Sequence, residues 1–181
     1  MTTATPRGSA PGRGLRHPDP RKDTGISAET EWLDQAVRIA ETNVANGGGP
    51  FGALIMKDGE VVATGVNRVT ANLDPTAHAE VVAIRAACQA LGTFKLDGCV
   101  LVSSCEPCPM CLSSALWARV AKVVYAADRD DAAKAGFDDR AFYELFDRPR
   151  DTWTVPVTRL SAKDGFAPFA AWLDKADRTD Y

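Results

Sequence analysis

Two short segments, residues 76–80 and 105–111, carry the residue types that bind a catalytic metal ion. Zn²⁺ prefers thiolate and imidazole ligands in a tetrahedron, and a catalytic site uses three protein ligands and leaves the fourth position to water. His78, Cys108 and Cys111 supply three such ligands. If a helix starts at Cys108, both sulfur atoms lie on one of its faces, because the two cysteines are three residues apart. The sequence therefore predicts one zinc ion per chain.

Two features favour a helix start at this point and the thiolate form of the cysteines. Pro107 and Pro109 suit a first helical turn, where the missing N–H of proline has no partner to lose. The N-terminus of a helix also favours a negative sulfur and lowers the pKa of a thiol. Geometry and electrostatics thus agree on the two cysteines as ligands.

Glu80 is the candidate for moving protons at this metal. It follows His78 by two positions, which diverge by about 200° on a helix, so both cannot be ligands from the same face. We expect its carboxylate to stand beside the water and act as a general acid and base. The alternative is a closed zinc knuckle with Cys105 as fourth ligand, in which Glu80 would have no purpose.

Length, composition and charge limit the possible protein classes. The 181 residues fit one ordinary domain with its own core, and five cysteines, an odd number, argue against a secreted disulfide framework. No run approaches the ~20 apolar residues of a membrane span, and the N-terminus lacks the apolar core of a signal peptide. We therefore expect a cytoplasmic protein.

The net charge of −3 is unevenly distributed. Residues 1–25 carry a net charge of +3 and almost no large apolar side chain, which leaves −6 for the remainder. We expect a disordered leader over 1–25, because such a segment cannot bury enough surface to offset its ordering entropy. Its basic charge leaves open a weak nucleic-acid contact or a targeting role. The acidic remainder is a poor match for a polyanion, so nucleic acid is not the expected partner.

Hydrophobic periodicity predicts an α/β fold, with Asp58-Gly59 as the turn of a hairpin. His78 is expected in the first turn of a helix, and the last strand, which contains Pro156, at an edge. The expected helices cover residues 31–45, 77–91, 108–117, 141–146 and 165–176, and the expected strands cover 51–57, 61–67, 99–104, 121–127 and 154–160.

Several motifs in register carry a family resemblance. His-x-Glu followed by Pro-Cys-x-x-Cys is the known signature of zinc-dependent base deaminases. With this signature, the sequence resembles the cytidine deaminase superfamily, and within it bacterial guanine deaminases. The likeness covers roughly residues 27–181, and the motifs are Pro50-Phe51-Gly52-Ala53, Asn67, residues 76–80, residues 104–111 and Ala135-Gly136-Phe137-Asp138-Asp139.

The resemblance implies a three-layer fold with a mixed five-stranded sheet flanked by helices, so that residues 26–181 form a zinc-dependent deaminase domain. It also implies a homodimer whose C-terminal segment swaps to close the partner's active site. By matching positions, the substrate-binding residues would be Asn67, Ala79, Tyr181 from the swapped tail, and the aromatic residues Phe51 and Trp117. One of the two aspartates Asp138 and Asp139 would also bind the substrate, and the resemblance favours Asp139.

Structural roles remain open for the same residues. Asn67 could be a turn residue at a strand end, and the two aspartates could be a solvated helix cap. Tyr181 could be a frayed chain end, since termini are often disordered. Phe51 and Trp117 could be core residues.

The predicted reaction is the hydrolytic deamination of guanine to xanthine and ammonia, with Glu80 as proton shuttle. The same metal centre would serve another small amidine, such as cytosine, a triazine such as ammeline, or guanosine. Deamination of adenosine in tRNA shares the metal residues but calls for a basic binding face. A noncatalytic zinc scaffold is the alternative from a different class, and Glu80 argues against it.

Overall fold

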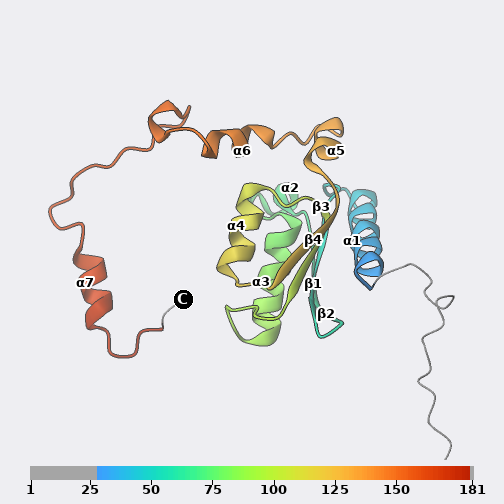
Figure 1. Ribbon diagram of the computed structural model, residues 1–181, viewed down its shortest axis with the longest axis horizontal. Coiled ribbons are helices and arrows are strands. Elements are labelled where there is room, and N and C mark those ends of the chain that lie inside the picture. The colour runs from blue at the N-terminus through green and yellow to red at the C-terminus, as the bar shows by residue number, and fades with distance from the viewer. Residues whose placement is uncertain (1–27, 180–181) are drawn as a thin grey trace, which may run out of the picture.

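A mixed sheet of four strands forms the centre of the computed structural model, which describes residues 28–179 (Figure 1). The strand order is β2-β1-β3-β4. The hairpin β1 (Gly52–Lys57) and β2 (Glu60–Val66) is antiparallel, β1 also pairs antiparallel with β3 (Val100–Cys105), and β3 pairs parallel with β4 (Lys122–Ala127). The predicted leader over 1–25 lies outside the described residues.

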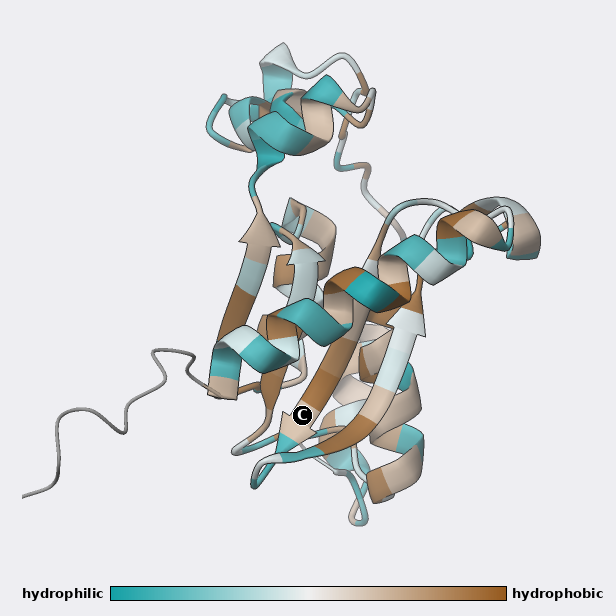
Figure 2. Ribbon diagram, turned by 90° about the vertical axis from the view of Figure 1, so that its right-hand side faces the viewer, coloured by the Kyte–Doolittle hydropathy of each residue, from teal (hydrophilic) through white to brown (hydrophobic). Residues whose placement is uncertain are grey.

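Helices cover both faces of this sheet and make three layers, as predicted (Figure 2). Alternate residues of β1 point to opposite faces. Ala53 and Ile55 pack with residues of α3 (Ala79–Leu91) and α4 (Pro109–Trp117), whereas Leu54 and Met56 pack against α1 (Ala28–Ala45). β1 is therefore buried on both sides, which explains its continuous apolar sequence.

A close approach between β2 and α3 fixes the start of α3. A Cβ added to Gly65 would lie 2.1 Å from the carbonyl oxygen of Ala79 and 2.5 Å from the nitrogen of Ala83. Only glycine allows the helix backbone so near the strand. This contact holds the first turn of α3, next to His78 and Glu80, against the sheet.

The predicted fifth strand over 154–160 is wrong, since the part of the chain that the structure describes forms four strands. Every residue of this segment is exposed and irregular, and Pro156 offers no N–H to a neighbouring strand. After β4 the chain runs away from the sheet (Figure 1), so no strand of the same chain is near enough to pair with the segment.

Five short helical segments complete the described chain. The helix predicted at 141–146 corresponds to α6 (Arg140–Phe146), and the one predicted at 165–176 is shorter, as α7 (Ala167–Asp174). The others are α2 (Val69–Asn72), α5 (Arg129–Lys134) and the 3₁₀ turn η1 (Arg150–Thr152), which were not predicted. The start of α5 is capped by Asp128, whose carboxylate accepts hydrogen bonds from the backbone N–H groups of Asp130 (3.0 Å) and Asp131 (2.9 Å).

Candidate active site

The starts of two adjacent helices bring the predicted zinc ligands together. His78 is the N-cap residue of α3, one position before the helical turn in which it was expected, and Cys108 is the N-cap residue of α4. Cys111 lies in the first turn of α4. The Nδ1 atom of His78 is 3.6 Å from the sulfur of Cys108 and 3.5 Å from that of Cys111.

These distances fit a tetrahedral zinc ion. Zn–S bonds of about 2.3 Å and Zn–N bonds of about 2.0–2.1 Å place a sulfur and a nitrogen ligand about 3.6 Å apart in a tetrahedron. Within the described residues, His78, Cys108 and Cys111 are the one such group of potential metal ligands, with ligand atoms within 4.8 Å of one another. The donor set is therefore that of an open, three-ligand zinc site.

Cys105 does not complete a closed zinc knuckle. Its thiol points to the carbonyl oxygen of Asp128, 3.7 Å away, and burial raises its pKa to about 11. Cys108 behaves in the opposite way, since hydrogen bonding from Cys111 and then His78 lowers its pKa to about 4 despite burial. Cys108 is thus favoured as thiolate and Cys105 as neutral thiol. The pKa of Cys111 is raised by its hydrogen bond with Cys108 and by burial, so Cys111 would lose its proton when zinc binds.

Glu80 is buried directly beside the three ligands. Its side chain comes from the first turn of α3 and is 6% exposed. The hydroxyl of Ser103 donates to one carboxylate oxygen (3.4 Å) and the thiol of Cys111 to the other (3.4 Å). Burial raises the pKa of Glu80, so the protonated form is accessible to a group that must accept and release a proton.

A cavity of about 970 Å³ opens in front of this cluster. His78, Glu80 and Cys108 contribute to its wall together with four phenylalanines and several polar groups. Its lining includes Gly49, Phe51, Asn67, Val69, Pro75, Cys105, Glu106, Met110, Ser113, Arg129, Phe137, Asp139, Phe142 and Phe146. An apolar pocket with a few convergent polar groups is typical of a site for a flat organic molecule.

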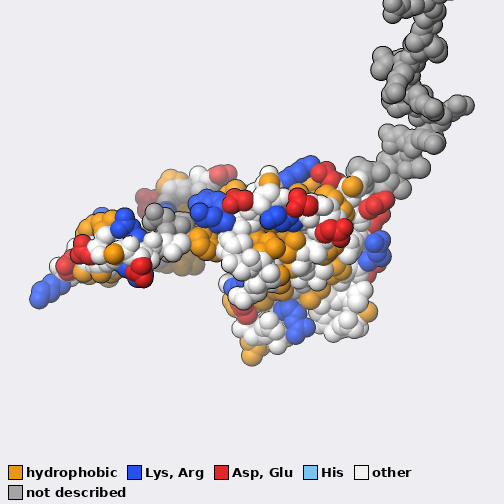
Figure 3. All heavy atoms as spheres, turned by 90° about the horizontal axis from the view of Figure 1, so that it is seen from below, with side chains coloured by type: hydrophobic (Ala, Val, Ile, Leu, Met, Phe, Trp, Pro, Cys, Tyr) orange, Lys and Arg blue, Asp and Glu red, His pale blue; other side chains and the backbone are white. Residues whose placement is uncertain are grey.

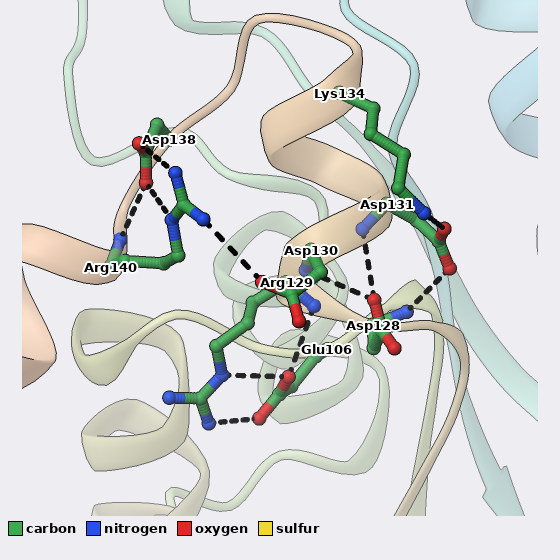
Figure 4. Close-up of polar contacts among 8 residues, drawn as sticks. All are labelled: Glu106, Asp128, Arg129, Asp130, Asp131, Lys134, Asp138 and Arg140. Atoms are coloured by element: carbon green, nitrogen blue, oxygen red, sulfur yellow. Dashed lines mark hydrogen bonds and ion pairs between the residues drawn. The ribbon is translucent and has the colours of Figure 1, made fainter.

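Both neighbouring aspartates border the cavity, but their side chains differ. Asp138 is exposed and forms an ion pair with Arg140 (2.6 Å), as Figure 4 shows. The Oδ1 atom of Asp139 is buried and has no hydrogen-bond partner within residues 28–179. Burial raises the pKa of Asp139. A buried acceptor without a donor in the chain itself suits a ligand that brings one.

Of the other predicted substrate residues, two line the cavity. Phe51 packs edge-on against Phe137, with ring centres 5.0 Å apart. Asn67 uses its side-chain oxygen to accept from the N–H of Val69 (3.3 Å), which leaves its amide N–H₂ for the cavity. Its backbone oxygen accepts from the side chain of Asn43 (3.0 Å).

The remaining three predicted substrate residues are placed differently. Trp117 lies at the far end of α4, outside the cavity lining, with its side chain 65% exposed and near Arg119. The structure of the chain therefore does not bring it to the site. Ala79 is fully buried, and only its backbone N–H, at the helix start where no intrahelical carbonyl is available, could face a ligand. Tyr181 lies outside the described residues.

Sequence reasoning missed several cavity residues. Phe142 and Phe146 are four residues apart on α6 and line the same wall, a spacing that could have marked them. Glu106 and Arg129 also line the cavity and form an ion pair. No sequence pattern pairs these two residues, because they are 23 positions apart.

The site geometry is that of a zinc-dependent hydrolase, and comparison with known proteins agrees with this class. Residues 26–127 match the family model described as the cytidine and deoxycytidylate deaminase zinc-binding region. The chain belongs to this family. The match contains β1 to β4 and all three candidate ligands.

Three relatives narrow the comparison. The guanine deaminase of Bacillus subtilis (strain 168) is 50% identical over 151 residues, which are 83% of this chain and 97% of that protein, and its crystal structure superposes with a TM-score of 0.81. A guanine deaminase from Nitrosomonas europaea is 34% identical, with a TM-score of 0.58 and coverage of 70% of this chain and 68% of that one. The tRNA-specific adenosine deaminase of Aquifex aeolicus (strain VF5) is 42% identical over 96 residues, 53% of this chain and 64% of that protein.

Proposed function

We propose that this protein is a zinc-dependent guanine deaminase, a hydrolase that converts guanine and water to xanthine and ammonia. The observation that carries the proposal is one cavity whose wall includes two members of an open three-ligand zinc site, His78 and Cys108, together with the buried carboxyl group of Glu80 and the unpaired buried oxygen of Asp139. The similarity to the Bacillus subtilis guanine deaminase over almost its full length supports the choice of guanine.

His78, Cys108 and Cys111 would hold the zinc ion. When bound, zinc acts as a Lewis acid that brings the pKa of a coordinated water near neutrality. Both sulfur ligands come from the start of α4, where the helix N-terminus stabilises negative charge.

Glu80 carries the protons of the reaction. Its carboxylate takes a proton from the attacking water and gives it to the ring nitrogen of guanine as the C2–O bond forms. It then takes the second proton to the amino group, so that the C2–N bond breaks and ammonia leaves. The hydrogen bond from Ser103 holds the carboxylate in the cavity wall during both transfers.

Asp139, Asn67 and the aromatic wall would read the base. Guanine presents hydrogen-bond donors at N1 and at its 2-amino group, which the unpaired carboxylate oxygen of Asp139 can accept. Asn67 has free amide hydrogens for a ring acceptor. The rings of Phe51 and Phe137 are perpendicular, so one of them can stack flat on the base while the other meets it with its edge; a stacked aromatic ring is worth about 1–3 kcal/mol per base in related contexts.

Release of ammonia from a panel of substrates tests this function. The zinc-loaded protein is assayed with guanine, cytosine, ammeline, guanosine and a tRNA substrate. We expect turnover of guanine to exceed that of every other compound. Preference for another small amidine would reassign the substrate. Turnover of adenosine in tRNA would overturn the proposal, because a chain with a net charge of −3 is not expected to bind a nucleic acid.

The working form is a homodimer in which the C-terminal segment is exchanged between subunits. All residues from 154 to 179 are exposed, and the large apolar side chains of Phe169 and Leu173 in α7 and of Phe166 just before it are not buried by the described chain. Figure 3 shows hydrophobic side chains on the surface of the part of the chain that extends away from the sheet. Such an apolar surface is costly in water and suits burial against a second copy. In this arrangement Tyr181 closes the partner's cavity.

Light scattering of the full chain measures the oligomeric state directly. We expect the mass of a dimer, and a monomer at micromolar concentration with full activity would contradict the exchange. The protein works in the cytoplasm, which the five unpaired cysteines favour. No helix of residues 28–179 combines the length and the apolar character needed to cross a membrane.

A further inference from the structure

Arg129 forms a fork with the carboxylate of Glu106 in the wall of the cavity (Figure 4). Its Nε–H donates to Oε2 of Glu106 (3.0 Å), a terminal N–H₂ group donates to Oε1, and its backbone N–H also donates to Oε2 (3.1 Å). Two parallel N–H···O bonds fix orientation as well as distance. This is the one ion pair of the described residues whose two partners both line the cavity.

Glu106 belongs to the loop that presents the sulfur ligands. It stands two positions before Cys108, and its N–H donates to the carbonyl oxygen of Ala127 at the end of β4 (2.8 Å). Arg129 is the first residue of α5. The fork therefore ties the metal-binding loop to α5.

The other side of Arg129 faces α6. Its guanidinium group lies 3.7 Å from the ring centre of Tyr143, and the hydroxyl of Tyr143 donates to the carbonyl oxygen of Pro107 (2.8 Å). Tyr143 follows Asp139 by four positions, and Asp139 is the N-cap residue of α6. Arg129 is thus packed between the loop that holds the zinc ligands and the helix that begins at Asp139.

A second link between α5 and α6 lies on the outer side of this contact. Arg140 pairs with Asp138 (2.6 Å) and with Asp130 of α5 (3.6 Å), as Figure 4 shows. These groups are about half exposed, so the link is weak. Of the residues that link α5 with α6, Arg129 and Tyr143 also bind the metal-binding loop, Arg129 at Glu106 and Tyr143 at Pro107.

We propose that Arg129 is a positioning residue for guanine recognition, which holds Asp139 at its place relative to the zinc ligands by joining Glu106 and Tyr143. The inference rests on the proposed function, in which Asp139 accepts from guanine. Arg129 acts through these two neighbours and not through the substrate. Lysine could not replace it, because a single ammonium group offers neither the fork to Glu106 nor the flat contact with the ring of Tyr143.

The first test compares Arg129→Ala and Arg129→Lys with the matched control Lys134→Ala. Lys134 pairs with Asp131 on the same helix but faces solvent. For Arg129→Ala we expect kcat/KM for guanine to fall about 10- to 100-fold, mainly through KM, while zinc remains at one ion per chain. Arg129→Lys should recover little of this loss, and Lys134→Ala should be unchanged. A normal KM in Arg129→Ala, or full activity in Arg129→Lys, would overturn the proposal.

The second test asks whether the effect passes through Asp139. In the Asp139→Asn background, Arg129→Ala should cost less than about 3-fold, since two changes in one network are not additive. A full, additive loss would contradict positioning of Asp139. If Asp139→Asn alone leaves KM for guanine unchanged, the recognition part of the proposed function fails instead.

Tyr143→Phe provides the test if Arg129→Ala does not fold. It removes only the hydrogen bond to Pro107 and keeps the ring under the guanidinium group. We expect kcat/KM to fall about 3- to 10-fold through KM, as the loss of one hydrogen bond predicts. An unchanged KM in this variant would count against the proposal.

Discussion

Replacement of Asp139 by asparagine probes guanine recognition most sharply. The Oδ1 atom of Asp139 is buried in the cavity wall without a donor, so nothing within the described chain competes for it. The substitution keeps the size of the side chain but removes its charge and one of its two accepting oxygens, so that only a neutral acceptor is left for the N1–H and the 2-amino group of guanine. A hydrogen bond to a charged group is worth about 1.5–3 kcal/mol, so kcat/KM should fall about 10- to 100-fold.

The assay follows initial rates of ammonia release over a range of guanine concentrations. Zinc content and thermal unfolding are measured on the same samples, because the expected loss is one of recognition and not of the metal. Asp138→Asn is the matched control: Asp138 also borders the cavity, but it is exposed and its carboxylate is already paired with Arg140, so its loss should leave KM unchanged. A change of less than about 3-fold in Asp139→Asn, well below the value of one charged hydrogen bond, would refute the assigned role, as would an equal effect of Asp138→Asn.

Three further predictions test the scaffold and the charge of the site. Gly65→Ala should destabilise the protein by about 1–3 kcal/mol, because its Cβ would meet the backbone of α3, whereas Gly165→Ala, in open space, should leave the thermal unfolding midpoint unchanged. Asn43→Ala should raise KM for guanine about 10-fold by removing the amide donors that hold Gly49 (2.8 Å) and the backbone of Asn67; a stability loss with normal KM would contradict this. KM for guanine should rise as the pH falls through the pKa of Asp139, which burial raises above its ordinary value, because protonation removes the charge and turns one accepting oxygen into a donor; steady-state rates across pH should show no such rise in Asp139→Asn.

The metal cluster could be predicted from the sequence because its geometry is local. Cys108 and Cys111 are fixed relative to each other by one helical turn, and Pro109, the first residue of α4, marks where the helix begins. His78 is 30 positions from Cys108, so local geometry does not place it beside the cysteines. A histidine and a glutamate two positions apart at a helix start nevertheless indicate a metal ligand with a neighbouring acid–base group. The four central strands were predicted for a similar reason, since their apolar runs are bounded by strong turn signals.

The region after β4 could not be predicted in the same way. A strand at 154–160 needs a partner, and local sequence does not reveal whether one is within reach. The same limit applies to Trp117, an aromatic residue of an apolar helix that faces outward at its end. Arg129 and Glu106 form an ion pair that depends on the parallel pairing of β3 and β4, which places the residues after both strands side by side.

The central claim is that three side chains hold a zinc ion next to a buried carboxyl group that transfers protons. The most direct measurement is the turnover of guanine by Glu80→Gln, made on protein whose zinc content has been determined. We predict one zinc ion per chain and a loss of kcat of about 10²- to 10⁴-fold, the usual contribution of general acid–base catalysis. Near-normal turnover with zinc bound would contradict the account.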